Sequence, residues 1–336
     1  MVRPMTTLIL TQPEIRALLP MAKCMELVAS ALESLARDEA QNPLRRGMLL
    51  ADGESLLGMM PGSLAEPAAV GLKVVGVFPR NHGTELDAHQ GVVLLFDPDY
   101  GVPRAVLDAS EITAIRTAAA SGVATRALAN AGAGDLALLG SGVQARTHLE
   151  AMLVARKLRR VRVFSPTRAS REAFAARESE RHGIRVEAVD SARAAVEGAD
   201  LVCTVTSART PVLAGEWLRP GCHVNAAGAC RKDARELDTE AVRRARLYVD
   251  RRESALAEAG DLLIPIAEGA LDASHIVGEL GEVLLGRCAG RRSEDEITLF
   301  ESLGIAVEDL VVANYLDHVG RERGAGTLVE LGGKRE

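Results

Sequence analysis

The sequence predicts an α/β protein in which a doubly wound parallel sheet is joined to a smaller α+β unit. From residue 135 onward, short apolar runs alternate with stretches of helical character, which is typical of a parallel sheet covered by helices. The first run, Asp135–Leu139, leads directly into the glycine-rich turn Gly140–Ala145. Before residue 110 the apolar runs are separated by turn residues instead, so mostly antiparallel strands are expected there.

The first 110 residues supply the α+β unit. A helix is expected to begin after Thr11, which can cap it, and to continue through the Met21–Arg37 region. A hairpin is expected around the turn Asp52-Gly53. Further strands are expected at Gly71–Phe78, Gly91–Phe96 and Arg104–Asp108, and an alanine-rich helix at Glu111–Asn130.

The parallel sheet is predicted from short apolar strands with helices between them. The expected strands are Leu136–Leu139, Val161–Phe164, Val186–Val189, Leu201–Thr206, His223–Ala227 and Leu247–Val249. The expected helices are Ala145–Arg156, Arg168–Arg181, Ser191–Glu197 and Asp238–Ala245. Apolar periodicity predicts one more helix over Glu294–Asp317.

The composition favours a globular protein of two domains, because the chain has 336 residues and is 47% hydrophobic. Its net charge is −6 with no basic run, so neither nucleic acid nor an anionic membrane is an expected partner. The apolar run near the N-terminus is too short for a signal peptide, and no stretch reaches the roughly 18 residues that span a bilayer. Five cysteines without a CxxC pair predict reduced thiols, a cytoplasmic location and no metal site.

The turn Gly140-Ser141-Gly142-Val143-Gln144-Ala145 is typical of a Rossmann dinucleotide site, because it lies between a strand and a helix. The first glycine permits the tight turn, and the second lets the backbone approach a pyrophosphate. The small Ala145 lets helix and strand pack closely, and the helix N-terminus offers N–H groups to phosphates. The alternative is a glycine-rich turn that binds no ligand.

The end of the second strand favours NADP(H) over NAD(H), although NAD(H) remains possible. An acidic residue there would accept the ribose hydroxyls of NAD. The sequence has Ser165-Pro166-Thr167-Arg168 instead. Ser165 and Thr167 can donate hydrogen bonds to a 2′-phosphate, and Arg168 supplies positive charge. The alternative is that Arg168 is a solvated residue in the first turn of a helix.

Several segments together resemble the ornithine cyclodeaminase/mu-crystallin family over nearly the whole chain. They are Leu72-Lys73, Ala88–Asp97, Ile112–Ala120, Leu139–Ala145, Val224–Asp238, Glu279–Val283 and Leu303–Asp309. The resemblance implies a substrate-binding and dimerisation domain over residues 1–117 with 310–336, around a Rossmann NAD(P)-binding domain over residues 118–309. It also implies a homodimer that acts on α-amino or α-imino acids.

Three cations match the positions at which this family binds a substrate carboxylate, namely Arg45, Lys73 and Arg116. Lys73 stands in an apolar run, where its charge is unfavourable unless an anion pairs with it, and a substrate could be that anion. Arg116 suits bidentate carboxylate binding. The alternative is that these cations form intramolecular salt bridges, and the adjacent Arg46 makes the choice of Arg45 ambiguous.

Other candidates are assigned less specifically. We expect cofactor contacts from Thr117, Thr204, Ala227 and Cys230, with Thr206 also at a strand end. His89 could contact substrate or cofactor, or be structural. Of Glu279 and Glu282, one could cap a helix and the other approach the site.

Two positions depart from the ornithine-cyclising members of the family, which carry acidic residues where this chain has Gly58 and Cys230. A small residue at the second position resembles the ketimine reductase branch. We therefore expect an NAD(P)H-dependent reductase of α-imino acids, such as Δ1-pyrroline-2-carboxylate or Δ1-piperideine-2-carboxylate, that gives L-proline or L-pipecolate. The alternatives are an alanine dehydrogenase-like enzyme, an ornithine cyclodeaminase and a non-catalytic NADPH- or small-ligand-binding protein.

Overall fold

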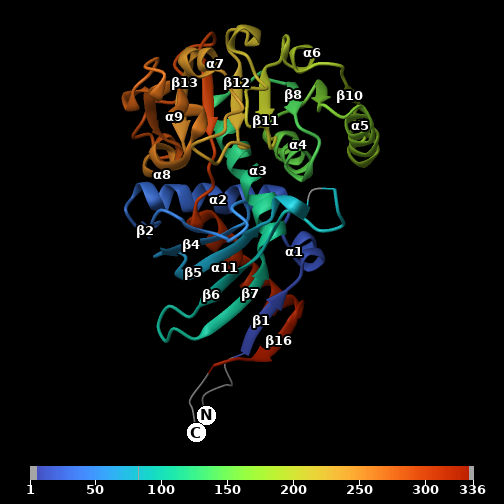
Figure 1. Ribbon diagram of the computed structural model, residues 1–336. Coiled ribbons are helices and arrows are strands. Elements are labelled where there is room, and N and C mark those ends of the chain that lie inside the picture. The colour runs from blue at the N-terminus through green and yellow to red at the C-terminus, as the bar shows by residue number, and fades with distance from the viewer. Residues whose placement is uncertain (1–5, 82, 333–336) are drawn as a thin grey trace. The chain divides into compact units, whose positions relative to one another are not determined.

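The computed structural model describes residues 6–81 and 83–332, which divide into two compact units (Figure 1). The mixed-sheet unit contains the residues up to Arg116 and those from Ile305 onward, and the parallel-sheet unit is Thr117–Gly304. The second boundary lies before the expected residue 310, because the last helix begins at Ala306 and belongs wholly to the mixed-sheet unit. The expected α/β fold class is confirmed.

Among the described residues, the mixed-sheet unit contains a sheet with the strand order β16-β1-β7-β6-β5-β4-β2, and β3 also pairs with β4. Neighbouring strands are antiparallel except β1 and β7. The strands are β1 (Thr6–Leu10), β2 (Ala40–Gln41), β3 (Arg46–Leu49), β4 (Leu56–Leu64), β5 (Ala69–Val77), β6 (His89–Phe96), β7 (Pro103–Asp108) and β16 (Thr327–Glu330). The hairpin and the three later strands expected from the sequence are confirmed, whereas β1 and β16 were not predicted.

The first helical region is two helices rather than the single one expected. Helix α1 (Gln12–Leu18) begins after Thr11 as predicted, with Glu14 completing the cap by accepting from the Thr11 N–H at 2.8 Å. The chain leaves the helical conformation at Leu19 and Pro20, and α2 (Met21–Ala36) then begins. Pro20 explains the break, because the residue before a proline is disfavoured in helical geometry.

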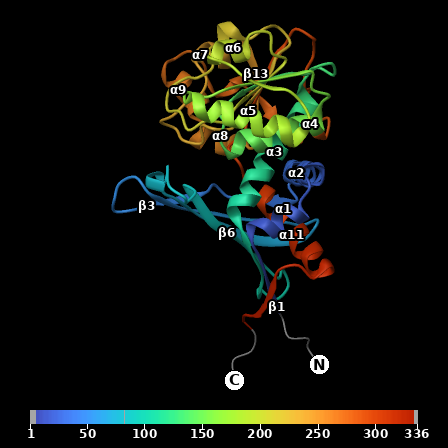
Figure 2. The same cartoon turned by 90° about the vertical axis from the view of Figure 1, so that its right-hand side faces the viewer.

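One face of the mixed sheet is covered by α11 (Ala306–Arg323), and α2 packs against α11 (Figure 2). Side chains on this face, such as Lys73, Val93 and Leu107, are buried, and they alternate with half-exposed ones along each strand. Gly71 in β5 permits α11 to approach the sheet closely, because a Cβ at this position would lie 2.7 Å from the Leu310 side chain of that helix.

The parallel-sheet unit has the strand order β10-β9-β8-β11-β12-β15-β13-β14, with every pairing parallel. The strands are β8 (Asp135–Leu139), β9 (Arg160–Phe164), β10 (Val186–Ala188), β11 (Leu201–Thr204), β12 (His223–Ala226), β13 (Ala245–Val249), β14 (Ile276–Glu279) and β15 (Ile297–Glu301). The helices are α4 (Val143–Ala155), α5 (Arg168–His182), α6 (Ala192–Val196), α7 (Thr239–Arg244), α8 (Arg252–Glu258), α9 (Gly260–Ala267) and α10 (Leu280–Leu284). Helix α3 (Ala109–Leu128) begins in the mixed-sheet unit and ends in this one.

The helix expected over Glu294–Asp317 is wrong in its first half. Residues Ile297–Glu301 form β15, which lies between β12 and β13 and is buried along its whole length. A strand buried on both faces has no alternating pattern, so apolar periodicity does not separate it from a helix. Gly304, with a φ of +75°, then separates β15 from α11.

Within the described residues, the structure contains no helix with both the length and the apolar character that a membrane span requires.

Candidate functional site

Four charged side chains, Lys73, Arg116, Glu308 and Asp309, form a buried cluster inside the mixed-sheet unit, here called the ion cluster. Lys73 Nζ lies 3.0 Å from Oδ1 and 2.9 Å from Oδ2 of Asp309. Arg116 donates from Nε to Asp309 Oδ1 at 3.0 Å and from Nη1 to Glu308 Oε2 at 2.8 Å. Because both carboxylates are 0% exposed and both cations only 4%, Asp309 bridges two cations away from solvent.

Three elements bring the ion cluster together. Strand β5 turns Lys73 toward the face that α11 covers, between Met60 and Val93 on the neighbouring strands. Lys73 also donates to Thr113 Oγ1 of α3 at 3.2 Å. The two carboxylates lie in the first turn of α11, where the positive end of the helix dipole stabilises negative charge.

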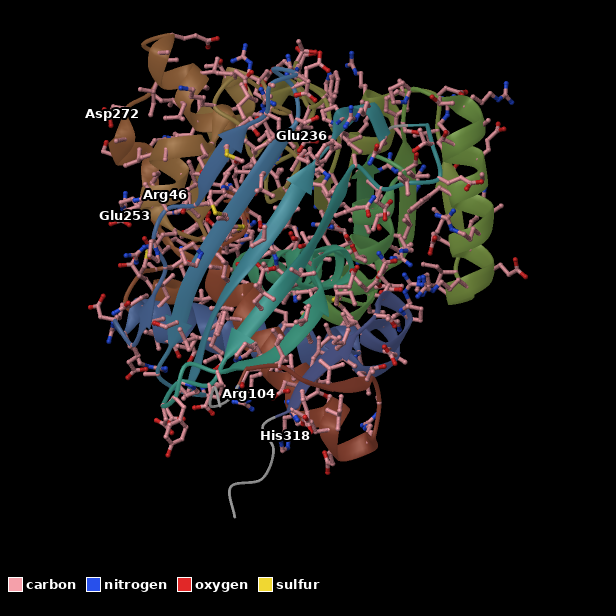
Figure 3. All side chains as sticks on the ribbon, turned by 60° about the horizontal axis from the view of Figure 1, so that its bottom comes forward. Arg46, Arg104, Glu236, Glu253, Asp272 and His318 are labelled. Carbon is pink, nitrogen blue, oxygen red and sulfur yellow. The ribbon has the colours of Figure 1, made fainter. Side chains whose placement is uncertain are left out.

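The electrostatics of the cluster make Lys73 an unusual lysine. Its pKa is lowered to about 8, first by burial and then by the positive charges of Arg116 and Arg45, while Asp309 acts in the opposite direction. Arg45 is half-buried, whereas the adjacent Arg46 is exposed on β3 (Figure 3). Arg45 is therefore the arginine of this pair that influences Lys73.

The physical argument made for Lys73 from the sequence needs correction. Its charge has a protein partner, because Asp309 supplies the anion that a substrate was expected to supply. The intramolecular salt bridges considered as the alternative are present for both Lys73 and Arg116. Sequence reasoning missed Glu308 and Asp309 as members of the site, although two adjacent acids at the start of an apolar helix were an available signal.

The glycine-rich turn of the parallel-sheet unit has the geometry of a phosphate site. Gly140 has a φ of +123°, and a Cβ there would lie 2.7 Å from the Val205 carbonyl oxygen, so the turn requires glycine. A Cβ on Gly142 would meet nothing within 4 Å, so the space beside it is open. Gly142 is the N-cap residue of α4, and Ala145 in the first turn of that helix is fully buried. These residues fit a dinucleotide pyrophosphate.

The end of β9 carries no acidic residue among residues 165–168. Ser141 Oγ donates to Ser165 Oγ at 2.9 Å, which joins the glycine-rich turn to this strand end. Thr167 occupies the N-cap position of α5 without a side-chain capping hydrogen bond. Arg168 is 77% exposed and pairs with Glu172 at 2.7 Å. Arg168 is thus an exposed cation in a first helical turn, with a carboxylate neighbour one turn further along.

Three residues expected to contact the cofactor, Thr204, Ala227 and Cys230, lie at the carboxyl ends of β11 and β12. The Ala227 N–H donates to the Thr204 carbonyl at 3.0 Å. Cys230 Sγ lies 3.9 Å from the Ala227 carbonyl oxygen and 4.0 Å from that of Ser302. Ser302, which follows β15, therefore lies at the same sheet edge as these candidates. This neighbour was not predicted, because a helix was expected over Glu294–Asp317.

The remaining candidate site residues lie in helices or at the ends of helices and strands. Thr117 is buried in α3. His89 is exposed at the start of β6, and its carbonyl accepts from Ser110 Oγ at 2.9 Å. Glu279 and Glu282 form a capping box at the start of α10. Among the residues that the structure describes, no group of three or more His, Cys, Asp and Glu side chains is arranged to hold a metal ion.

A comparison with protein families matches residues 5–322 to the ornithine cyclodeaminase/mu-crystallin family. The chain belongs to this family. The expected family is thereby confirmed, and the match includes both the ion cluster and the glycine-rich turn.

Individual relatives give the same result. The ketimine reductase mu-crystallin of Mus musculus is 44% identical over 271 residues, which are 81% of this chain and 82% of that protein. The solved structure of Thermococcus litoralis Δ1-pyrroline-2-carboxylate reductase in complex with NADH and L-proline has a TM-score of 0.94 and 38% identity, covering 96% of this chain and 100% of that one. An archaeal alanine dehydrogenase dimer with bound NAD has a TM-score of 0.92 and 31% identity, covering 98% and 100%.

The ion cluster leads to a prediction about stability. We expect Asp309→Ala to lower the free energy of unfolding by about 3–5 kcal/mol, because it leaves Lys73 and Arg116 buried without their shared partner. Denaturant titration of the full chain measures the change.

Asp317→Ala is the matched control. Asp317 is equally buried in α11, but its partners Arg104 and Arg321 are 34% and 32% exposed and can be solvated after its removal. An Asp309→Ala loss no larger than that of Asp317→Ala would contradict the bridging role of Asp309.

Proposed function

We propose that the chain is an NAD(P)H-dependent reductase of α-imino acids, with Δ1-pyrroline-2-carboxylate and Δ1-piperideine-2-carboxylate as substrates and L-proline and L-pipecolate as products. The observation that carries this proposal is the Thermococcus litoralis structure, which contains NADH and L-proline and aligns with 96% of this chain. The mouse ketimine reductase supports the same reaction class.

In this mechanism, Arg45, Lys73 and Arg116 bind the substrate carboxylate. Glu308 and Asp309 hold Lys73 and Arg116 in fixed positions, so little side-chain freedom is lost when the carboxylate binds. When bound, the cofactor supplies the hydride for the carbon of the C=N bond. An imine accepts hydride more readily when its nitrogen is protonated. Lys73 carries a proton at neutral pH and releases it more easily than an ordinary lysine, because its pKa is lowered to about 8.

For the cofactor we propose NADP(H) as the preferred form, with NAD(H) also bound. Ser165 and Thr167 offer hydroxyl groups to a 2′-phosphate, and Arg168 offers charge. Glu172 opposes this preference in part, because it pairs with Arg168. Gly140, Ser141, Gly142, Val143 and Gln144 would contact the pyrophosphate, with Thr117, Thr204, Ala227 and Cys230 contributing elsewhere.

The second candidate is an amino-acid dehydrogenase that reduces a 2-oxoacid in the presence of ammonia. The archaeal alanine dehydrogenase, with a TM-score of 0.92, favours it. Ornithine cyclodeamination is disfavoured, because Gly58 has no side chain and the Cys230 thiol is a poor substitute for a carboxylate.

A substrate panel tests the proposed reaction. We expect the purified protein to oxidise NADPH faster than NADH with both cyclic imines, and much more slowly with pyruvate plus ammonium. Absorbance of the reduced nicotinamide follows each reaction. Arg168→Ala should reduce the difference between the rates of NADPH and NADH oxidation.

Arg45→Ala is the variant that probes the carboxylate site without opening the buried ion cluster. Loss of a hydrogen bond to a charged group should raise the KM of the imine roughly 10- to 100-fold. Faster turnover of pyruvate plus ammonium than of either imine would favour the second candidate, and release of ammonia from ornithine would overturn the interpretation of Gly58 and Cys230.

The lowered pKa of Lys73 predicts a pH dependence of ligand binding. Pyrrole-2-carboxylate is a suitable probe, because its ring nitrogen does not titrate near neutral pH. Its affinity should fall as the pH rises above about 8, where Lys73 loses its charge. Calorimetry over roughly pH 6.5 to 9.5 measures this dependence, which should be absent in Lys73→Arg because arginine stays charged. The same decline in both proteins would show that Lys73 does not hold the carboxylate.

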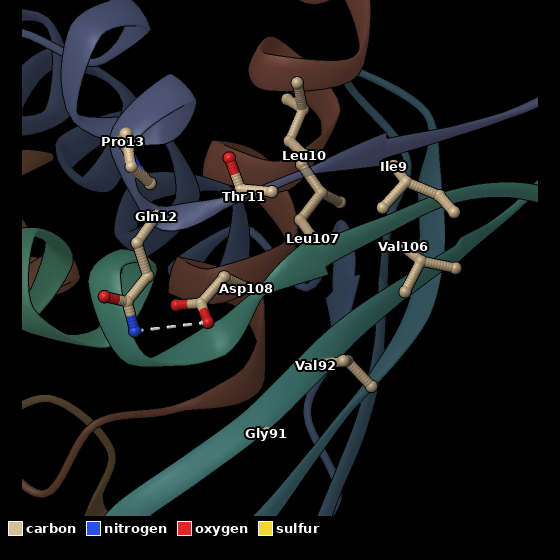
Figure 4. Close-up of a pocket in the computed structure, with 10 residues that line it drawn as sticks. All are labelled: Ile9, Leu10, Thr11, Gln12, Pro13, Gly91, Val92, Val106, Leu107 and Asp108. Atoms are coloured by element: carbon tan, nitrogen blue, oxygen red, sulfur yellow. Dashed lines mark hydrogen bonds between the residues drawn. The ribbon is translucent and has the colours of Figure 1, made fainter. Parts of the chain in front are cut away.

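We also propose a homodimer formed through the mixed-sheet unit. The sheet face opposite α11 carries a ladder of half-exposed aliphatic side chains on paired strands. The start of α1, at Gln12 and Pro13, lies beside one end of this ladder. Its members are Ile9, Met59, Leu72, Val74, Val92, Leu94 and Val106. Several of them also line a pocket of 440 Å³, where Gln12 Nε2 donates to Asp108 Oδ2 at 3.4 Å (Figure 4). A continuous apolar surface of this kind is typical of protein interfaces.

Sedimentation equilibrium tests the dimer. We expect twice the chain mass of 35.6 kDa for the unmodified protein and a single chain mass for Leu94→Lys, which places a charge in the middle of the ladder. Leu328→Lys, at a 56% exposed position on the edge strand β16, should remain a dimer. A monomeric unmodified protein would contradict the proposal.

A further inference from the structure

A single buried carboxylate joins two strand ends of the parallel-sheet unit. Glu236 Oε1 accepts a hydrogen bond from the Thr206 N–H at 2.6 Å, just after β11. Its other oxygen, Oε2, accepts from the Gly228 N–H at 2.9 Å, just after β12. The Glu236 side chain (labelled in Figure 3) is fully buried. We call this arrangement the Glu236 clasp.

The backbone around Glu236 is itself held in place. The N–H groups of Glu236 and Leu237 donate to Asp261 Oδ1 at 2.9 and 2.7 Å. The carbonyl of Glu236 accepts from Val212 and Leu213 at 2.7 and 3.0 Å. The carboxylate therefore projects from an anchored segment and has little freedom to follow the strand ends if they move.

Gly228 permits the clasp to close. A Cβ at this position would lie 2.5 Å from Glu236 Oε1 and 2.4 Å from the Thr206 carbonyl oxygen. Any larger residue would push the end of β12 away from the carboxylate. The carboxylate also suits this place chemically, because the two N–H groups approach different oxygens of the side chain, and a glutamine would turn its own NH2 group toward one of them.

The Glu236 clasp lies at the edge of the sheet where a cofactor is expected to bind. Open parallel sheets bind their cofactors at the carboxyl ends of the strands, beside the point where the strand order reverses. Here that point lies between β8 and β11, and Thr206 and Gly228 follow β11 and its neighbour β12. Both segments contain residues expected to contact the cofactor.

We propose that Glu236 is a positioning residue that sets the cofactor-binding geometry by clasping the ends of β11 and β12. It acts through the backbone of Thr206 and Gly228. The proposal rests on the proposed use of a nicotinamide cofactor, but not on the identity of the imino acid.

The experiment compares Glu236→Gln with the unmodified protein in the full chain. Calorimetry without substrate gives the NADPH dissociation constant, which should rise about tenfold, as for loss of a hydrogen bond to a charged group. The kcat for the imine should fall as well. The KM for the imine should stay within about twofold, because the carboxylate-binding cations belong to the other unit.

Asp200→Asn is the matched control. Asp200 also accepts from two backbone N–H groups, those of Gly134 and Asp135 at 2.8 and 3.0 Å, but at the amino ends of β8 and β11. It should lower the melting temperature and leave both the NADPH dissociation constant and kcat unchanged. If Glu236→Gln does not fold, Gly228→Ala opens the same clasp and should give the same pattern.

An unchanged NADPH dissociation constant in Glu236→Gln would overturn the proposal. An equal rise of this dissociation constant in Asp200→Asn would overturn it as well. If the unmodified protein binds neither NADPH nor NADH, the proposed function and this inference both fail. Cofactor binding without turnover of any imine contradicts only the proposed activity, because the calorimetric comparison still decides the role of Glu236.

Discussion

The mixed-sheet unit depends on the ion pairs that the Asp309 carboxylate forms with Lys73 and Arg116. This carboxylate lies within 3.0 Å of both Lys73 and Arg116, so three elements, β5, α3 and α11, converge on one buried group. Burying two cations is unfavourable unless their charges are matched, and removing one partner from such a group is strongly destabilising. The same contact fixes the two cations that we assign to substrate binding, which links the stability of this unit to its proposed chemistry.

Three buried carboxylates of the parallel-sheet unit bind backbone groups. Glu236, Asp200 and Asp250 each accept hydrogen bonds from pairs of backbone N–H groups, in the case of Asp250 those of Leu303 and Gly304. Buried N–H groups outside strands and helices need such acceptors. Loops at both edges of this sheet are therefore held by side chains, and Asp200 in addition pairs with Arg159 and Arg219 at 2.7 and 2.9 Å.

Features set by neighbouring residues could be predicted from the sequence, and features set by distant ones could not. The strand, turn and helix around Gly140–Ala145 were predicted correctly, because these elements follow one another in the sequence. The pairing of Lys73 with Asp309 was missed, because 236 positions separate them and no pattern relates the two. Strand β15 was mistaken for helix, because a short run that is buried on both faces has no diagnostic period.

The same distances explain why the clasp of Glu236 was not foreseen. The motif that contains Glu236 was recognised as a segment resembling the family, but its carboxylate reaches backward to Thr206 and Gly228 through folds of the chain that only the structure supplies. The break at Pro20 was missed for the opposite reason. The signal was local, because Pro20 disfavours helical geometry at Leu19, but the expected helix was continued across it.

The division of the mixed-sheet unit between two parts of the chain has a consequence for biosynthesis. Translation completes Lys73 and Arg116 long before Glu308 and Asp309, and the whole of Thr117–Gly304 is made in between. That intervening segment is continuous and holds its own core, so it can fold while the ribosome is still at work. The ion cluster can form only after α11 has left the ribosome. The unit whose synthesis starts first is therefore the one whose folding finishes last.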